Sequence, residues 1–85
     1  MSIESYFKEY KSLFDSYNVN VSLIQTSDDA AKPIQIIRKK NEYIIVWNIK
    51  TMFGNEKVLL DNCVRTIILQ NFILYTNQTK NGSSL

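Results

Sequence analysis

The stretch "IIRKKNEYIIVW", residues 36–47, decides the fold of this chain, because it sets three consecutive cations between two runs of branched and aromatic residues. Such runs are typical of β-strands, and a short polar segment between them is typical of a turn. We therefore predict two antiparallel strands, over 34–39 and 42–49, joined by a turn at Lys40-Asn41. The three cations then lie at the corner of a hairpin.

The register of this hairpin divides its side chains between two faces of a sheet, because successive residues of a strand point to opposite sides. Across the hairpin Ile36 faces Ile45, and Lys39 faces Glu42 as a pair of opposite charges. The predicted core face carries six apolar residues: Ile34, Ile36, Tyr43, Ile45, Trp47 and Ile49. The other face has polar ends and an apolar centre: Gln35, Ile37, Ile44, Val46 and Asn48.

Two helices and a third strand are predicted outside the hairpin. Aromatic and aliphatic residues recur at steps of three and four over 3–17, and Ser2 suits the N-cap of that helix. Apolar and polar residues alternate over 19–26, as they do in a half-buried strand. After "TMFG" the helical spacing returns over 56–75, and Asn55 is the predicted N-cap.

The second helix leaves one alternative open. Asp61 and Arg65 stand four residues apart and are expected to pair, while Cys63 belongs to the apolar stripe of the same helix. The β-branched residues of "TIILQNFILYT" also permit a hairpin that turns at Gln70-Asn71. Sequence alone leaves helix and hairpin open for this segment.

Together these elements predict an α+β fold, in the order helix, three-stranded antiparallel meander, helix, with both helices on one face of the sheet. Residues 1–76 form a single domain in this prediction, and residues 77–85 a flexible polar tail. We expect the centre of the core to be formed by Leu13, Phe14, Ile36, Ile45, Trp47, Val64, Ile67 and Ile68.

Length and charge bound the class of protein. At 85 residues the chain supports one domain with one core. Its net charge of +2 is unevenly placed, since residues 1–31 hold two cations against five anions and residues 32–85 hold eight against three. A single cysteine suits a reducing compartment, the first residues lack a signal-peptide pattern, and no apolar run is long enough for a membrane span. We therefore expect a cytoplasmic protein.

The composition also lacks the residues on which most catalysis depends. The chain has no histidine, so the usual general base and nitrogen ligand are missing. One cysteine cannot build a zinc site, and two glycines cannot form a phosphate-cradling loop. We expect a non-catalytic protein that works by binding, with no metal and no cofactor.

One hypothesis is that the chain binds RNA or another polyanion. Arginine makes bidentate contacts with phosphates, and lysines act as point charges, so a basic hairpin corner suits phosphate binding. The candidate residues are Lys32, Arg38, Lys39, Lys40, Lys50 and Lys57. A structural alternative stays open, in which these cations keep the hairpin soluble and protect the sheet edges.

A second hypothesis is that the chain binds another protein or a second copy of itself. Helices on one side of the sheet leave the other side uncovered, and its centre is apolar. The candidate interface is Gln35, Ile37, Ile44, Val46 and Asn48. Salt distinguishes the two hypotheses, because phosphate binding weakens steeply with ionic strength and apolar contact does not.

The predicted order of elements over 3–75 resembles that of double-stranded RNA-binding domains. In that family a basic cluster opens the second helix after a glycine-containing loop, and "FGNEKVLL" offers Gly54 and Lys57 at those places, with Glu56 between them. The style of "KKNEYIIVWNIKT" is similar to that of small early phage proteins that neutralise host enzymes, toxins or defences. That resemblance implies an inhibitor, with an RNA-associated inhibitor of a host toxin as the form that suits the basic corner.

Overall fold

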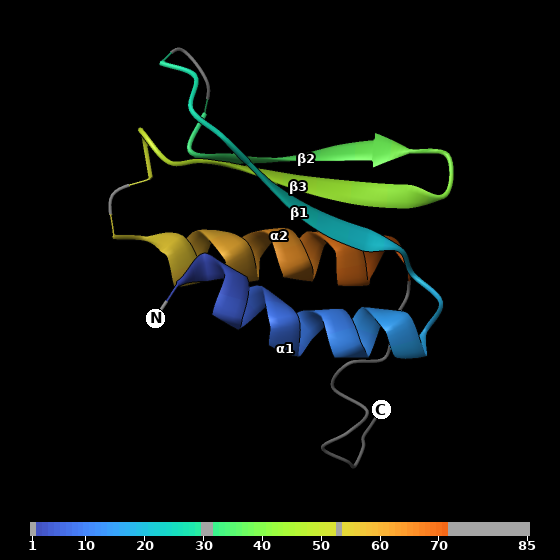
Figure 1. The fold of residues 1–85 in the computed structure, drawn as a ribbon. Helices are drawn as coiled ribbons and strands as arrows, with labels where there is room; N and C mark the ends of the chain where they lie inside the picture. The colour runs from blue at the N-terminus through green and yellow to red at the C-terminus, as the bar shows by residue number, and fades with distance from the viewer. Residues whose placement is uncertain (1, 30–31, 53, 72–85) are drawn as a thin grey trace.

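The computed structural model describes residues 2–29, 32–52 and 54–71. Within these residues the chain forms two helices and one three-stranded sheet, and both helices lie against the same face of that sheet (Figure 1). The elements are α1 (Ile3–Ser16), β1 (Val21–Thr26), β2 (Ile34–Lys39), β3 (Glu42–Asn48) and α2 (Glu56–Gln70). The predicted α+β class is therefore confirmed. The element ends lie within two residues of the prediction except at the end of α2, where the described helix ends at Gln70 and the prediction ran to 75.

The hairpin has the predicted register, whereas the strand order differs from the prediction. β2 and β3 pair antiparallel, with Ile36 opposite Ile45 and Lys39 opposite Glu42. β1 does not continue a meander beside β2. It pairs parallel with β3, so that the sheet order is β1-β3-β2 and the antiparallel meander is wrong.

The composition of the strands explains why β3 takes the centre. Its run "YIIVW" is apolar on both faces. The central strand is flanked by a strand at each edge, and the helices cover one of its two faces, so its apolar side chains are shielded there better than on an edge strand. β2 ends in Arg38 and Lys39 and follows Pro33, features that natural edge strands use to discourage further pairing. A meander would have placed these charges in the middle of the sheet.

The connection from β1 to β2 has to pass the end of β3, and Asn48 holds it there. The side chain of Asn48 is completely buried. Its Nδ2 donates a hydrogen bond to the carbonyl oxygen of Asp28, and its Oδ1 accepts one from the backbone N–H of Lys50 at 2.9 Å. The backbone N–H of Asn48 donates to the carbonyl oxygen of Pro33 at 2.8 Å.

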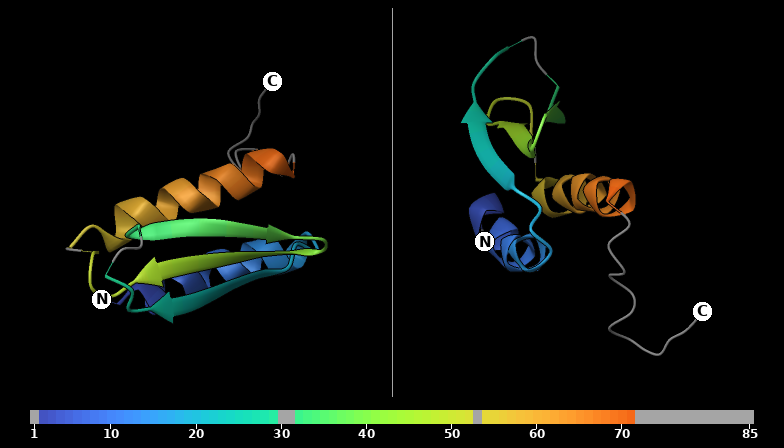
Figure 2. Two further views of the ribbon diagram at one scale, coloured as in Figure 1. Left: turned by 90° about the horizontal axis from the view of Figure 1, so that it is seen from above. Right: turned by 90° about the vertical axis from the view of Figure 1, so that its right-hand side faces the viewer.

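The core lies between the sheet and the two helices, with α1 packed under β1 and α2 under β2 (Figure 2). Five of the eight predicted central residues are buried: Phe14, Ile45, Val64, Ile67 and Ile68. The other three pack against this cluster while partly exposed: Leu13, Ile36 and Trp47. Ile49 was predicted on the core face and is 50% exposed, because the strand ends one residue before it.

The helix ends follow the predicted capping at one helix only. Ser2 caps α1, and its hydroxyl accepts from the backbone N–H of Ser5. Asn55 occupies the N-cap position of α2, but its side chain makes no capping hydrogen bond. Cys63 is buried in α2 as its apolar stripe predicts. The predicted pairing of Asp61 with Arg65 is wrong. Asp61 pairs instead with Lys57, one turn earlier in α2.

The alternative hairpin at the end of the chain is excluded as far as the structure describes it. The backbone is α-helical through Gln70, and Asn71 is the C-cap residue. The predicted continuation of the helix over 72–75 and the predicted tail over 77–85 lie outside the described residues.

Candidate functional site

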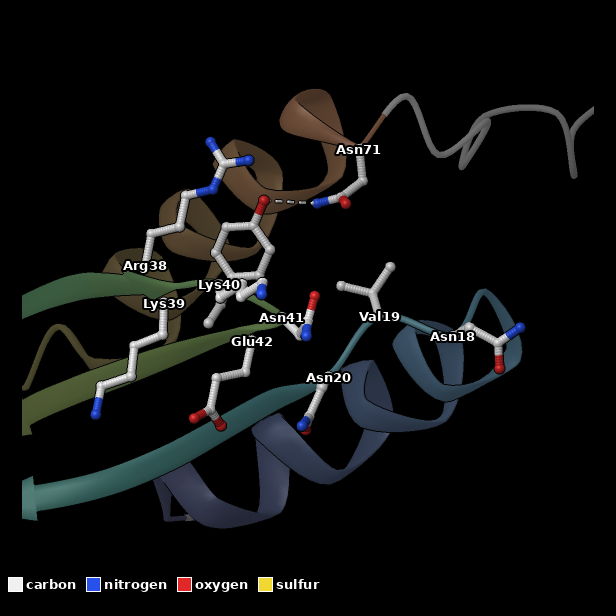
Figure 3. Close-up of a pocket in the computed structure, with 10 residues that line it drawn as sticks. Asn18, Val19, Asn20, Arg38, Lys39, Lys40, Asn41, Glu42 and Asn71 are labelled. Carbon is white, nitrogen blue, oxygen red and sulfur yellow. Dashed lines mark hydrogen bonds between the residues drawn. The ribbon is translucent and has the colours of Figure 1, made fainter.

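Three exposed cations lie at the free end of the β2–β3 hairpin, and we call Arg38, Lys39 and Lys40 the basic tip. The hairpin turns over Lys40-Asn41, as the sequence predicts. Lys39 and Arg38 leave the strand on opposite sides (Figure 3). This alternation places Lys39 on the sheet face turned away from the helices and Arg38 on the helix side.

The side chain of Arg38 lies beside Tyr43, and the Tyr43 hydroxyl is hydrogen-bonded to Asn71. Its guanidinium carbon lies 5.6 Å from the centroid of the Tyr43 ring, within the range of a cation–π contact. The Tyr43 hydroxyl accepts a hydrogen bond from Asn71 Nδ2 at 3.0 Å, and the same nitrogen donates to the carbonyl oxygen of Ile67 at 2.9 Å. The arginine is thus tied, through one aromatic ring, to the C-terminal end of α2.

A pocket of about 400 Å³, which we call the tip pocket, opens beside these residues (Figure 3). It is lined by the basic tip, by the connection from α1 to β1, and by the end of α2. Its walls carry four asparagines, three cations and one carboxylate: Asn18, Asn20, Asn41, Asn71, Arg38, Lys39, Lys40 and Glu42, with Val19 and Tyr43 completing the lining. Neutral amides and positive charges together suit a ligand that has both an anionic and a hydrogen-bonding part.

The local backbone explains why the connection from α1 reaches this site. Asn18 has a φ of 58°, a left-handed conformation that asparagine tolerates better than most residues. The next backbone N–H, of Val19, donates to the carbonyl oxygen of Phe14 at 2.9 Å, which closes the end of α1. The Asn20 carbonyl oxygen then accepts from the backbone N–H of Tyr43 at 2.8 Å, which fixes the start of β1 beside the start of β3.

The structure separates the six predicted cations into two groups. Lys32 and Lys50 lie at the opposite end of the sheet from the basic tip, since they flank the pairing of Pro33 with Asn48. Lys57 lies in the first turn of α2 at that same end (Figure 1).

Two of the cations at that end have partners within the chain. Lys50 Nζ pairs with Asp29 Oδ1 at 3.0 Å. Lys57 Nζ lies 3.4 Å from Asp61 Oδ2 and 5.4 Å from the centroid of the Tyr6 ring. The structure therefore groups Arg38, Lys39 and Lys40 and does not bring the other three predicted cations to them.

The sheet face turned away from the helices carries the second predicted site, and among the described residues no element covers it (Figure 2). We call Ile24, Gln35, Ile37, Ile44 and Val46 the outer face. Ile24 lies beside Val46 and is 49% exposed, and Ile37 lies beside Ile44 and is 39% exposed. Ile24 was not predicted for this face, and the pairing of β1 with β3 places it beside Val46. Asn48 was predicted at the rim and is instead buried by its hydrogen bonds within the chain.

The described residues show few groups that suit catalysis. Within 2–29, 32–52 and 54–71, no group of three His, Cys, Asp or Glu side chains is placed to hold a metal ion. Burial raises the pKa of the Cys63 thiol to about 11, which disfavours the nucleophilic thiolate. Neither α1 nor α2 has the length and apolar character that crossing a bilayer requires.

Comparisons with protein-family models, with curated proteins and with solved structures returned no match to this chain.

Proposed function

We propose that this protein is a non-catalytic binder that contacts RNA or another polyanion through its basic tip. The observation that carries the proposal is the grouping of three exposed cations, Arg38, Lys39 and Lys40, at the free end of a hairpin beside a pocket rich in amides. Each phosphate that such cations neutralise releases counterions, which favours binding at moderate salt. In this proposal the chain acts in the cytoplasm as a small inhibitor or adaptor, like the phage proteins that neutralise host enzymes or toxins.

Because three of the six candidate cations lie at each end of the sheet, two triple variants can be compared. The first replaces Arg38, Lys39 and Lys40 by alanine, and the second replaces Lys32, Lys50 and Lys57. Both remove three positive charges, so both change the net charge equally. Binding that depended on net charge alone would weaken equally in the two variants, whereas binding through the basic tip weakens only in the first.

The measurement is the affinity for a labelled single-stranded RNA by fluorescence anisotropy over a series of salt concentrations. Three phosphate contacts predict a slope of log K against log salt of about −2, and the basic-tip variant should lose most of that slope and at least about tenfold in affinity. Thermal melts check that both variants stay folded. Equal losses in the two variants, or no binding by the unmodified protein, would refute the proposal.

A second candidate function is protein binding or homodimer formation through the outer face. The observation that favours it is the exposure of Ile24 and Ile37 on either side of Val46 and Ile44. Exposed isoleucines on both edge strands of one sheet face are typical of an interface, because water-exposed apolar area costs free energy that a partner removes. The partner is a second copy of the chain or a host or toxin protein.

Sedimentation of an outer-face variant tests this candidate. Ile24→Lys with Ile37→Lys should shift any dimer to monomer, with little change in thermal stability because both side chains are already partly in water. Ile49→Lys is the control, since Ile49 is equally exposed but lies beyond the end of β3. A sedimentation coefficient that does not depend on protein concentration and is identical in all three chains rejects the homodimer.

A further inference from the structure

We infer that the tip pocket takes one unpaired nucleotide of a single-stranded nucleic acid, with its phosphate against the basic tip and the edge of its base against asparagine amides. This inference rests on the proposed function and names its ligand. The volume of about 400 Å³ lies within the range of pockets that hold small organic ligands. A surface that bound phosphates alone would need cations but no such recess.

The amides are the first argument for a base in the pocket. Asn20 comes from the connection before β1, Asn41 from the hairpin turn and Asn71 from the end of α2, so three separate segments contribute the same type of side chain to the lining of one pocket. An asparagine amide presents a donor and an acceptor side by side, which matches the edge of a base, and of adenine in particular. Asn71 donates its Nδ2 hydrogens within the chain, and its oxygen points away from those contacts (Figure 3).

Arg38 provides a surface on which a base stacks. Its guanidinium carbon lies 5.6 Å from the centroid of the Tyr43 ring. That ring is only 6% exposed, so Tyr43 itself offers no stacking surface to a ligand. The arginine side chain is exposed, and guanidinium planes are used to stack unpaired bases in RNA-binding proteins. The tyrosine thus orients the arginine, and the arginine contacts the base.

Glu42 refines the class of base. It is the one acidic residue in the lining of the tip pocket, and its side chain leaves the hairpin on the same side as Lys39, opposite to Arg38, so that a base stacked on Arg38 reaches it only with its far edge (Figure 3). A carboxylate repels a phosphate, so the phosphate lies toward the cations. It accepts a hydrogen bond from an exocyclic amino group, which adenine, cytosine and guanine have and uracil lacks. The pocket should therefore prefer adenine, cytosine or guanine to uracil.

The geometry favours a single strand over a duplex. A second recess of about 480 Å³ adjoins the tip pocket at the turn, and all of its lining residues also line the tip pocket: Asn20, Lys39, Lys40, Asn41 and Glu42. A single strand that continues past the tip pocket enters this adjoining recess. Duplex RNA is bound mostly through phosphates and 2′-hydroxyls across a wide surface. Here the remaining candidate cations, Lys32, Lys50 and Lys57, lie at the far end of the sheet.

The test compares nucleic acids with a polyanion that has no bases. Labelled short oligomers of adenosine, cytidine and uridine, their DNA counterparts, a duplex RNA and inorganic polyphosphate are titrated with the protein at one salt concentration. The unmodified protein should bind oligo-A and oligo-C about tenfold more tightly than oligo-U. It should bind each single strand more tightly than the duplex. The RNA and DNA series show whether the 2′-hydroxyl contributes.

The variant that isolates the pocket is Asn20→Ala with Asn41→Ala, which leaves the net charge unchanged. It should lose about tenfold for oligo-A and stay within about twofold for polyphosphate, because the amides contact the base and not the phosphate. Asn62→Ala, on the exposed side of α2, is the matched control. Arg38→Lys is a second variant. It keeps the charge but removes the planar group, and it should likewise weaken oligo-A more than polyphosphate.

The outcomes separate this inference from the proposed function. If the unmodified protein binds neither oligonucleotides nor polyphosphate, the proposed function fails. Polyphosphate binding that depends on the basic tip would support the proposed function. If, in that case, the asparagine variant and Arg38→Lys change the affinity for all ligands equally, or for none, the pocket inference is overturned. Tighter binding of duplex RNA than of any single strand also overturns the inference.

Discussion

Replacing Asn48 tests whether the connection between β1 and β2 is held as the structure shows. Asn48→Ala removes two hydrogen bonds from a completely buried side chain, one donated to the Asp28 carbonyl oxygen and one accepted from the Lys50 N–H. Each such bond contributes about 1 kcal/mol, so the free energy of unfolding should fall by about 2 kcal/mol. In a domain of this size that loss lowers Tm by roughly 8–16 °C.

A second substitution, Asn48→Asp, tests whether the stability of the protein depends on the donor and acceptor atoms at this position. Asn48→Asp keeps an acceptor for the Lys50 N–H but faces the Asp28 carbonyl oxygen with a buried negative charge. It should therefore destabilise the protein more than Asn48→Ala does at neutral pH, and the difference should shrink as the pH falls and the carboxyl group becomes protonated.

Urea unfolding followed by the fluorescence of Trp47 measures both effects, and Asn62→Ala serves as the control because Asn62 is exposed on α2. The control should change the free energy of unfolding by less than about 0.5 kcal/mol. A loss of similar size for Asn48→Ala and for the control, or an Asn48→Asp variant as stable as the unmodified protein, would refute the placement of this side chain. It would also weaken the sheet order β1-β3-β2, since this order requires the connection to cross the end of β3.

Three further predictions concern the helices. Ser2→Ala removes the hydroxyl that accepts from the Ser5 N–H at the start of α1, and chemical denaturation should show a loss of about 1 kcal/mol, whereas Ser2→Asn should show almost none. Tyr10→Phe removes the hydroxyl that donates to Asp61 between the two helices, and the same measurement should show a loss of about 1 kcal/mol. Burial raises the pKa of Cys63 to about 11, so the folded state favours the protonated thiol. Above the ordinary thiol pKa of 9.0, the free energy of unfolding should fall by up to about 1.4 kcal/mol per pH unit until about pH 11, and Cys63→Ala should lack this slope.

The hairpin could be predicted from sequence because its signals are local. The alternating residues, the turn at Lys40-Asn41 and the match of Lys39 with Glu42 all lie within one short segment, and a shift of one residue would have turned the apolar set to the wrong face. The helical stripes are local in the same sense. Helix ends and strand ends depend on a few hydrogen bonds, which is why Ile49 was placed inside a strand that ends at Asn48.

The strand order could not be predicted by the same reasoning, because it depends on which strand gains most from the centre of the sheet. The signal was present in the continuous apolar run of β3, whose side chains are best shielded when a strand pairs with it on each edge, and in the charges of β2. Once β1 pairs with β3, Ile24 joins the outer face and Asn20 reaches the start of β3. The tip pocket needs a further long-range contact, the hydrogen bond from Asn71 to Tyr43, which no local pattern indicates.

Protection of a sheet edge against pairing accounts for the cations of the basic tip. It does not account for the asparagines that line the tip pocket. Charges along β2 discourage pairing with another chain whether or not they bind a ligand. The asparagines around the tip pocket give no such protection, because Asn20 belongs to the connection before β1 and Asn71 to the end of α2. If edge protection were the whole role, alanine at Asn20 and Asn41 would be neutral for every ligand, while loss of the basic tip would promote association between copies of the chain. Binding of an unpaired nucleotide requires the opposite pattern, in which the amides matter for oligonucleotides and the cations for every polyanion.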